Sequence, residues 1–346
     1  MVYRFPLVVL VVASATVAGL APAAVKVLPQ PSGVSVRLRG LSAVSSRIAW
    51  ASGAGGTVLR TTDAGNTWQQ RVIPDADALD FRDIDAISDR IAFALSIGPG
   101  DASRIYRTDD GGEHWQLQFI NRDPQIFLDA MAFASADRGF VVGDAVDGAF
   151  VVLGTENGGR EWKRLPGDRL PVALAGEGAF AASGTNVAVR GRARVWIATG
   201  ASRVLRSIDG GRSWAIAKTP LLSGESAGIF SIAFRDDRHG VIVGGDYRRE
   251  QTAGANAAIT GDGGLTWTLA SHGVGGYRSV VAWVPGTAAS FVAAGPSGMD
   301  VSDDNGRTWR PTAAAGFDTV SFAPGRVGWA AGAAGRMAHL EAQWVK

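Results

Sequence analysis

Six charged residues recur at matched places along this chain, and they are the side chains best suited to chemistry. They stand where short apolar segments begin, with Phe230 at the one uncharged position of the series: Arg39, Arg82, Asp129, Glu177, Arg278 and Asp318. Arginines gathered at one opening would bind a carboxylate or another anion, and two carboxylates at a suitable separation could hydrolyse a glycosidic bond. The alternative is mutual neutralisation, three arginines against three acids, in a purely structural network.

Other kinds of chemistry find little support in the sequence. The chain has no cysteine, which excludes disulfides, thiol nucleophiles and thiolate metal sites. Phosphate-binding loops and dinucleotide fingerprints are absent, and the four histidines lack metal-ligand spacing: His114, His239, His272 and His339. The 34 basic residues are scattered among 32 acidic ones, which argues against a nucleic-acid surface. We therefore expect no metal, no cofactor and no nucleic-acid partner.

An eight-residue phrase that recurs six times indicates the elements that position these charges. Its form is Ser or Thr, then Asp or Asn, Gly and Trp at fixed offsets, and the tryptophans are 47, 47, 52, 53 and 42 residues apart. That period fits a four-stranded propeller blade rather than a helical repeat. The residues that define the phrase are Asp63 and Trp68, Asp110 and Trp115, Asn157 and Trp162, Asp209 and Trp214, Asp262 and Trp267, and Asp304 and Trp309.

A second signature precedes the phrase and occurs seven times. An aromatic or branched residue stands a few positions before a glycine, as in Trp50 with Gly53 and Trp329 with Gly332. Short apolar runs between turn residues read as strands, and no stretch of the mature chain has convincing helical periodicity. We predict an all-β fold, a seven-bladed β-propeller of four-stranded antiparallel blades, with blades at roughly 34–74, 79–122, 127–168, 174–219, 227–272, 277–313 and 317–346.

The last repeat lacks the phrase, so the ring needs another outer strand to avoid an unpaired sheet edge. We expect residues 25–30 to supply it, with Val25 to Leu28 as its centre. The alternative is that Glu341 to Val345 turns back to form that strand.

The phrase itself is expected to be structural. It falls at the turn between the third and fourth strands, where an Asp or Asn side chain accepts N–H groups two residues ahead and Gly permits a positive φ angle. Asp109-Asp110 and Asp303-Asp304 resemble parts of a cation loop, but the full Ca²⁺ ligand pattern is missing.

These residues carry a family resemblance. The phrase resembles the Asp-box, or bacterial neuraminidase repeat, of sialidases, other propeller glycosidases and sortilin-type receptors. Combined with an arginine in the third strand, as in Val58-Leu-Arg-Thr-Thr-Asp63, it looks like the family of the photosystem II stability and assembly factor and its bacterial relatives. That resemblance covers essentially all of the mature chain and implies an exported seven-bladed propeller, but it specifies little about function.

The sialidase resemblance is partial. Phe81-Arg82 and Tyr277-Arg278 echo the aromatic-Arg start of the sialidase motif, but the Ile-Pro that follows there is absent. A sialidase also requires a Tyr nucleophile paired with Glu and an acid Asp, and no such partners are evident for Tyr106, Tyr247 or Tyr277 from the sequence.

The first residues have the form of an export signal. A positive charge at Arg4 precedes an apolar run from Leu7 to Gly19, and Ala21-Pro22-Ala23 offers a cleavage site. We expect residues 1–24 to be a signal peptide and 25–346 to form a single periplasmic or secreted domain. An uncleaved membrane anchor is the alternative.

The sequence favours a monomeric, non-enzymatic binding or assembly scaffold. Its expected partner is a protein or peptide of the cell envelope, held on the face that carries Arg39, Arg82 and Arg278, with the charged loops Asp144 to Asp147 and Asp246 to Glu250 as further candidates. The alternative is a sialidase-like or other propeller glycoside hydrolase, with Asp129, Glu177 or Asp318 as its carboxylates. A glycan-binding lectin is a third possibility.

Overall fold

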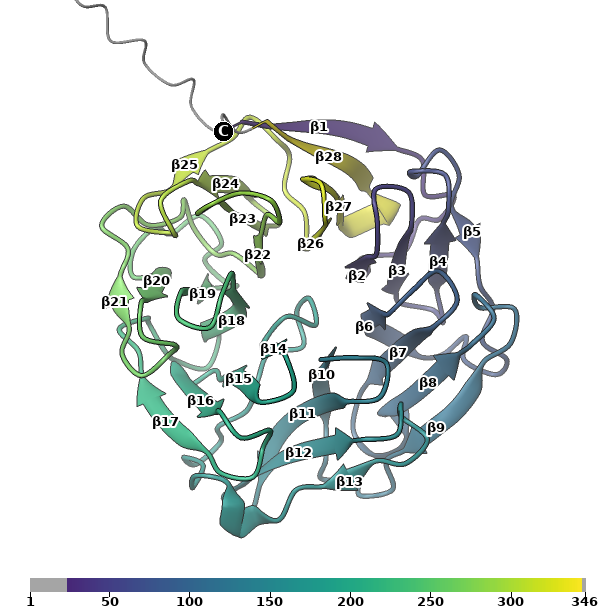
Figure 1. Ribbon diagram of the computed structural model, residues 1–346, viewed down its shortest axis with the longest axis horizontal. Coiled ribbons are helices and arrows are strands. Elements are labelled where there is room, and N and C mark those ends of the chain that lie inside the picture. Colours follow the sequence, from purple (N-terminus) through teal and green to yellow (C-terminus); the bar gives the residue numbers. More distant parts are fainter. Residues whose placement is uncertain (1–23, 344–346) are drawn as a thin grey trace, which may run out of the picture.

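Seven four-stranded antiparallel sheets stand around a common centre in the computed structural model, which describes residues 24–343 (Figure 1). The predicted seven-bladed β-propeller is confirmed. In the described residues the helical elements are three 3₁₀ turns, η1 (Gly100–Ala102), η2 (Gly167–Arg169) and η3 (Ala333–Gly335). No helix in this part of the chain is long and apolar enough to cross a bilayer. The predicted leader, Ala24 apart, lies outside the described residues.

The first six sheets each use four consecutive strands, ordered from the centre outward. The first three are β2 (Leu38–Ala43), β3 (Ala49–Gly53), β4 (Val58–Thr61) and β5 (Gln69–Gln70); β6 (Asp80–Ala86), β7 (Ala92–Ile97), β8 (Arg104–Thr108) and β9 (Gln116–Ile120); and β10 (Leu128–Phe133), β11 (Gly139–Val146), β12 (Ala149–Thr155) and β13 (Lys163–Arg164). The next three are β14 (Val187–Arg190), β15 (Arg194–Ala198), β16 (Arg203–Ser207) and β17 (Ala215–Lys218); β18 (Ala227–Phe234), β19 (Gly240–Asp246), β20 (Ala257–Thr260) and β21 (Thr268–Leu269); and β22 (Val280–Trp283), β23 (Phe291–Gly295), β24 (Gly298–Ser302) and β25 (Arg310–Pro311).

The seventh sheet joins the two ends of the chain. It contains β26 (Thr319–Ala323), β27 (Val327–Ala331) and β28 (Met337–Gln343), and its outer strand is β1 (Ala24–Gln30) (Figure 1). β1 pairs antiparallel with β28 in an unbroken register from Ala24 opposite Gln343 to Gln30 opposite Met337. Glu341 to Gln343 belong to β28, so the alternative in which they turn back as an outer strand is wrong.

Aromatic side chains fill the spaces between the sheets. Trp50, Trp196 and Trp329 are fully buried, and all come from second strands, where the sequence placed an aromatic residue before a glycine. Rings from the adjoining sheet stack on second-strand aromatic residues: the ring centroid of Phe133 lies 3.8 Å from that of Phe93 on β7, and that of Phe234 lies 3.7 Å from that of Trp196. Burial of such rings contributes roughly 1.5–3 kcal/mol each, and it is the main force that holds neighbouring sheets together.

The eight-residue phrase forms the same turn in each of the first six sheets, and its polar groups satisfy one another. In the first copy the Thr61 hydroxyl donates to Asp63 at 2.8 Å and accepts the N–H of Gly65 at 2.8 Å. Asp63 accepts the N–H of Thr67 at 3.0 Å. The acceptor contact therefore spans four residues rather than the expected two, because the intervening glycine, at φ +79°, lets the chain loop back over the carboxylate. We call these segments the repeated turns.

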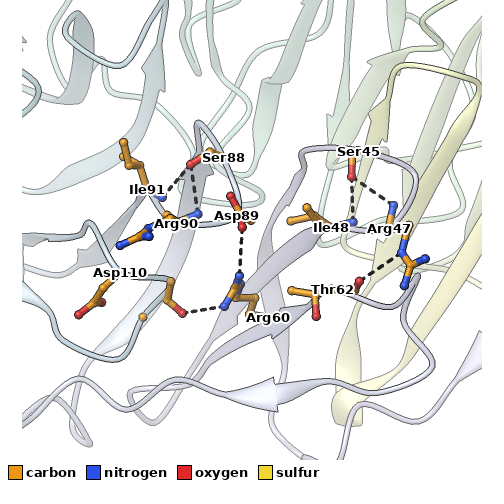
Figure 2. A network of polar contacts seen from close by, with 12 residues as sticks. Ser45, Arg47, Ile48, Arg60, Thr62, Ser88, Asp89, Arg90, Ile91 and Asp110 are labelled. Carbon is orange, nitrogen blue, oxygen red and sulfur yellow. Dashed lines mark hydrogen bonds and ion pairs between the residues drawn. The ribbon is translucent and has the colours of Figure 1, made fainter.

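Third-strand arginines of the first and fourth sheets each join their sheet to the repeated turn of the next one. Arg60 on β4 donates to the carbonyl of Gly111 in the next sheet's turn at 3.3 Å and faces Asp89 at 3.8 Å (Figure 2). Arg206 on β16 reaches the equivalent carbonyl of Gly263 at 2.7 Å. The arginine that the sequence placed before the phrase thus joins two sheets.

Two faces result from this topology. One face, here the turn face, carries the connections between first and second strands together with the repeated turns. The backbone unites them, since Gly111 N–H donates to Arg90 O at 2.9 Å and Gly263 N–H to Arg238 O at 2.8 Å. The opposite face, here the entry face, carries the connections between second and third strands and the connections from one sheet to the next.

Candidate functional site

The inner strands open onto the entry face at β-bulges. The pairing of β2 with β3 shifts between Leu38 and Gly40, which leaves Arg39 as the extra residue. The same shift isolates Arg82 in β6, Asp129 in β10 and Phe230 in β18. A bulge redirects the side chain of its extra residue. The matched positions found in the sequence are therefore structurally equivalent in these four sheets.

A hollow of about 310 Å³ lies at the centre of the entry face. We call it the central hollow. Its charged lining includes Arg37, Arg39, Arg82, Glu250 and Asp318, and its aromatic lining consists of Phe180, Phe230, Tyr247 and Tyr277. Of the six charged residues singled out in the sequence, the structure brings Arg39, Arg82 and Asp318 together here.

Asp318 is neutralised by Arg37, a residue that the strand alignment did not select. Arg37 donates to both carboxylate oxygens, from Nε at 2.8 Å and from Nη2 at 2.6 Å. This bidentate geometry is the strongest form of arginine–carboxylate contact, and the hydrogen bond to Asp318 raises the pKa of Arg37. Arg37 lies just before β2, two residues from Arg39, so alternation along the strand was the signal that could have found it.

The side chains of Arg39 and Arg82 reach the segment that precedes β14. Arg82 Nη1 donates to the carbonyl of Ala181 at 2.9 Å, and its Nε donates to Asp80 at 2.8 Å. Arg39 Nη1 makes only a long contact, 3.4 Å, with the carbonyl of Ala182.

Arg39 differs from its neighbours because no carboxylate pairs with it among the described residues. Burial lowers the pKa of Arg39, and the nearby cations Arg82 and Arg37 lower it further. Its guanidinium remains charged, since arginine does not lose its proton in proteins. The centre of the hollow therefore holds a partly dehydrated positive charge with unused donors.

Aromatic rings form the opposite wall of the central hollow. Phe180 and Phe230 stack with centroids 4.0 Å apart, and Tyr247 contacts both edge to face at 6.3 and 6.2 Å. Tyr277 lies 4.7 Å from Phe230 and is 5% exposed. Burial raises the pKa of the Tyr277 hydroxyl well above its usual range. Tyr247 and Glu250 belong to the charged loop that the sequence had selected, whereas no sequence signal pointed to Phe180.

Arg278 does not reach the central hollow, and the expectation that it lies on the binding face is wrong. Its side chain is 4% exposed, and its Nε donates to Asp300 at 2.6 Å. Asp300 lies on β24 within the same sheet and is itself 1% exposed. Asp300 is a carboxylate buried among apolar strands, and Arg278 turns inward and neutralises it.

Glu177 likewise does not line the central hollow. β14 starts only at Val187, so Glu177 precedes the strand that it was expected to begin. It receives hydrogen bonds from Arg203 Nε at 2.9 Å and from the Thr199 hydroxyl at 2.6 Å. Burial raises the pKa of Glu177, but these hydrogen bonds outweigh burial and hold the pKa below its usual value.

The alignment failed here because the connection into the fourth sheet is long and partly apolar. Val187 pairs with Ile197 as Met131 pairs with Val141, so the residue equivalent to Asp129 is Thr185. Thr185 donates to the Ser231 hydroxyl of the next inner strand at 2.7 Å, which makes it part of the contact between sheets.

Asp129 occupies its predicted place but is 1% exposed, and its Oδ2 has no hydrogen-bond partner. Burial raises the pKa of Asp129 strongly, the nearby Asp144 raises it further, and Arg82 opposes both. Asp144, from the second loop selected in the sequence, accepts the N–H of Ala179 at 3.1 Å. Neither carboxyl group belongs to the lining of the central hollow.

Comparisons with known proteins establish the fold. YCF48 from Cyanidioschyzon merolae is 19% identical with a TM-score of 0.66, and the match covers 92% of this chain and 99% of that one. A structure described as YCF48 bound to D1 peptide is 17% identical with a TM-score of 0.59, covering 93% and 96%. A GH74 xyloglucanase from Xanthomonas campestris is 15% identical with a TM-score of 0.60, and covers 93% of this chain but 56% of its own.

No protein-family model matches the chain, and no curated protein is similar enough to count as a relative. At identities below 20%, the solved structures share the propeller architecture with this protein. What the central hollow binds has to be argued from its own residues.

Proposed function

We propose that this protein is a non-enzymatic binding scaffold whose central hollow holds a carboxylate on a peptide segment of a partner protein. The observation that carries the proposal is Arg39, a partly buried guanidinium with no carboxylate partner among the described residues. Arg82, from the inner strand of the next sheet, adds a second guanidinium to the hollow. Arg37 lines the hollow as well, but its guanidinium is paired with Asp318.

A carboxylate suits this site for two physical reasons. A guanidinium offers parallel N–H donors that match both carboxylate oxygens, and the charge–charge attraction is stronger where water is partly excluded. The hollow, about 310 Å³, is near the lower limit for ligand sites, which fits a chain end or one acidic side chain. An adjoining side chain of the peptide would pack against Tyr247 and Phe180.

The closed ring favours this role because it presents the arginines without reorganisation. Binding then loses little conformational entropy, so a few contacts suffice for affinity. YCF48, a protein of the same fold, has been solved bound to a D1 peptide. That complex supports the idea that a propeller of this architecture can hold a peptide.

We infer further that the protein acts outside the cytoplasm, as a monomer, on an envelope protein. The support is the signal-peptide pattern of residues 1–24, in which an apolar run ends at Ala21-Pro22-Ala23. Amino-terminal sequencing of the protein recovered from the periplasm, with Val25 or a nearby residue first, tests this part independently.

The binding test uses short fluorescent peptides that end in a free carboxylate after an aromatic residue, compared with the same peptides amidated at the carboxyl end. We expect the free acid to bind at least about tenfold more tightly, because amidation removes the charge that Arg39 recognises. Arg39→Glu combined with Arg82→Glu should abolish that preference. Arg278→Glu is unsuitable as a test, since it would place two carboxylates together in the core.

The matched control is Arg192→Glu, the same charge reversal at an exposed position in the β14–β15 connection on the turn face. It should leave binding and the melting temperature unchanged. Equal affinity for acid and amide, or full binding by the double variant, would refute the assignment of this surface.

One observation keeps a glycoside hydrolase of the sialidase type as a second candidate. The central hollow gathers three arginines with Tyr277, Glu250 and Asp318, which are the residue types that the resemblance to sialidases implies. Against it, burial raises the pKa of Tyr277, so its hydroxyl is a poor nucleophile, and Asp318 is held by Arg37. Hydrolysis of aryl sialosides by the purified protein, abolished by Tyr277→Phe, would favour the enzyme over the scaffold.

A further inference from the structure

A second cavity, about 600 Å³, lies between the third and fourth sheets on the turn face. We call it the rim pocket. It shares no lining residue with the central hollow. Phe140 and Leu165 form its apolar part, and the repeated turns at Glu156 and Gly211 border it. Its size falls within the range of small-molecule sites.

The pocket exists because the third sheet has a glycine where the second and fourth sheets have Arg107 and Arg206. Leu153 pairs with Arg164 as Leu59 pairs with Gln70, so Gly154 occupies the position of Arg60. In the first and fourth sheets, that arginine spans the gap to the next repeated turn. With glycine in its place, the volume of a long side chain is left open.

The carbonyl that this arginine would have satisfied is not left unpaired. Arg138, from the connection between β10 and β11, donates to Gly210 O at 2.7 Å. Gly210 corresponds to Gly111 and Gly263 in the other turns. Arg138 thus makes the hydrogen bond that the missing arginine would have made, but it comes from a different connection. The space of the missing side chain therefore remains unfilled.

An aromatic ring is missing from the same interface. In the two flanking interfaces, Phe133 stacks on Phe93 and Phe234 stacks on Trp196. The pairing of Val189 with Val195 places Val189 where Phe133 stands in the third sheet. Phe140 consequently has no ring stacked on it in the described part of the chain, and only the Arg138 guanidinium lies over it, at 5.6 Å.

The rim of the pocket carries a local excess of positive charge. Five basic and two acidic residues line it, on a chain with a net charge of +2. Arg138 pairs with Glu156 at 3.0 Å, and Lys163 pairs with Glu161 at 3.3 Å. The remaining three have no carboxylate partner in the structure as described: Arg164, Arg169 and Arg212.

We propose that the rim pocket binds a small amphipathic anion, a molecule with an apolar body and one carboxylate, sulfonate or phosphate group. The apolar body would occupy the space of the absent arginine and ring, against Phe140 and Leu165. The anionic group would lie at the rim, where Arg164 and Arg212 provide charge-assisted hydrogen bonds. A cationic ligand is disfavoured by the same three unpaired arginines.

Fluorescence titration with 8-anilinonaphthalene-1-sulfonate, an aromatic anion, tests the proposal on the folded protein. The decisive variant is Gly154→Arg, which restores the side chain used by the neighbouring sheets. A Cβ at Gly154 would lie 3.3 Å from Leu165 Cδ1, a flexible atom that can move, and the backbone there does not require glycine. We expect the saturable fluorescence to fall at least about tenfold as the pocket fills, with no loss of melting temperature.

Two further measurements separate this site from non-specific dye binding. Arg164→Glu with Arg212→Glu changes only exposed residues and should weaken binding about tenfold or more through lost charge attraction. Uncharged N-phenyl-1-naphthylamine should bind the native protein at least about tenfold more weakly than the sulfonate.

Arg60→Gly is the matched control, because it opens the equivalent space between the first and second sheets without the unpaired arginines of the rim pocket. It should add no second sulfonate site. Unchanged dye binding by both Gly154→Arg and the rim variant would overturn the proposal, as would equal affinity for the uncharged analogue.

Discussion

The turn face and the entry face of this propeller differ in how their charged and polar groups are paired. On the turn face, six repeated turns satisfy their own polar groups, and arginines such as Arg60 and Arg206 carry the same contact into the next sheet. On the entry face no such repeat exists. Its central hollow mixes a neutralised pair, Arg37 with Asp318, and a guanidinium without a carboxylate, Arg39.

The difference separates structural charge from charge available for binding. The repeated turns are conspicuous in the sequence, but their hydroxyl and carboxylate groups are already hydrogen-bonded to one another. These groups are therefore not available to a ligand. Available groups occur where equivalent positions carry different residues, as at the recurring bulge, which holds Arg39 in one sheet and Phe230 in another, or at Gly154, which replaces a joining arginine. In a repeat protein, departures from the consensus are therefore better indicators of function than the consensus itself.

The largest effect is expected from deleting residues Ala24–Gln30, which removes the strand on which the rigidity of both faces depends. The outer edge of β28 would lose its seven-residue pairing, and Val25 and Val27 would no longer pack on the core of the seventh sheet. Two fully buried valines would contribute roughly 3–6 kcal/mol, and because Val25 and Val27 are partly buried we expect them to account for a loss below that range. Urea unfolding measures it, and a deletion that left stability unchanged would contradict the role of β1.

Lys26→Ala is the control for that deletion. Its ion pair with Glu341 spans 3.5 Å between side chains that are 53% and 42% exposed. Exposed pairs contribute at most about 1 kcal/mol. Only a small change in stability is expected, so the two variants distinguish strand pairing from surface charge.

Next in size is Glu177→Gln, which sharpens the division between structural and available charge. The change leaves the Arg203 guanidinium, 9% exposed as a residue, without its counter-charge. Breaking a buried pair from one side costs about 3–5 kcal/mol, and the retained amide contacts put the expected loss near the lower end. Peptide binding at a temperature where the variant is folded should equal that of the native protein. Lost binding with intact stability would mean that Glu177 belongs to the site.

Buried acids of the inner strand β6 and acids of the repeated turns should respond differently to pH. Burial raises the pKa of Asp85 to about 6 and raises that of Asp83 strongly, whereas hydrogen bonds, chiefly from Ser213, hold the pKa of Asp209 at about 2. A raised pKa in the folded state means that the folded protein binds protons more tightly than the unfolded chain. The stability that this provides is complete below about pH 4 and is lost as the pH rises through about 6.

We therefore expect the melting temperature to fall between about pH 4 and pH 7, a range in which Asp209 no longer titrates. Replacing both Asp83 and Asp85 with Asn should make this part of the profile shallower, because an amide does not titrate. The amide oxygens can still accept the N–H groups of Met131 and Phe133, which now donate to the two carboxylates. The slope, rather than the absolute melting temperature, is the diagnostic quantity. An unchanged slope in the double variant would assign the pH dependence to other buried acids, of which Asp129 also has a raised pKa.

Sequence reasoning succeeded where structure repeats and failed where the chain departs from the repeat. The tryptophan intervals and the glycines of the second strands predicted the seven sheets, because each sheet must bury the same faces against its neighbours. Arg39 and Arg82 were found by aligning strand starts. Glu177 was misplaced because the connection before β14 has no repeat to align with, and Arg278 because its partner Asp300 lies in another strand.

The aromatic wall of the central hollow was beyond the reach of such alignment. Phe180 lies in the irregular segment before β14, and its contact with Phe230 joins residues from two different sheets. Pairings of this kind depend on the path of a loop across the ring, which strand periodicity does not encode.

The smallest predicted effect contrasts one residue from each face. Asp304 in a repeated turn accepts the Thr308 N–H at 3.0 Å and its hydroxyl at 2.6 Å, so Asp304→Ala should cost about 1–2 kcal/mol without altering peptide affinity. Arg39→Ala should do the reverse, because it breaks no ion pair and only a 3.4 Å hydrogen bond in the folded protein while removing the proposed anchor. Chemical unfolding measures the stability of both variants, and peptide titration measures their affinity, so each variant is tested for both properties. If Asp304→Ala reduced affinity as much as Arg39→Ala did, the division between a self-satisfied face and a binding face would not hold.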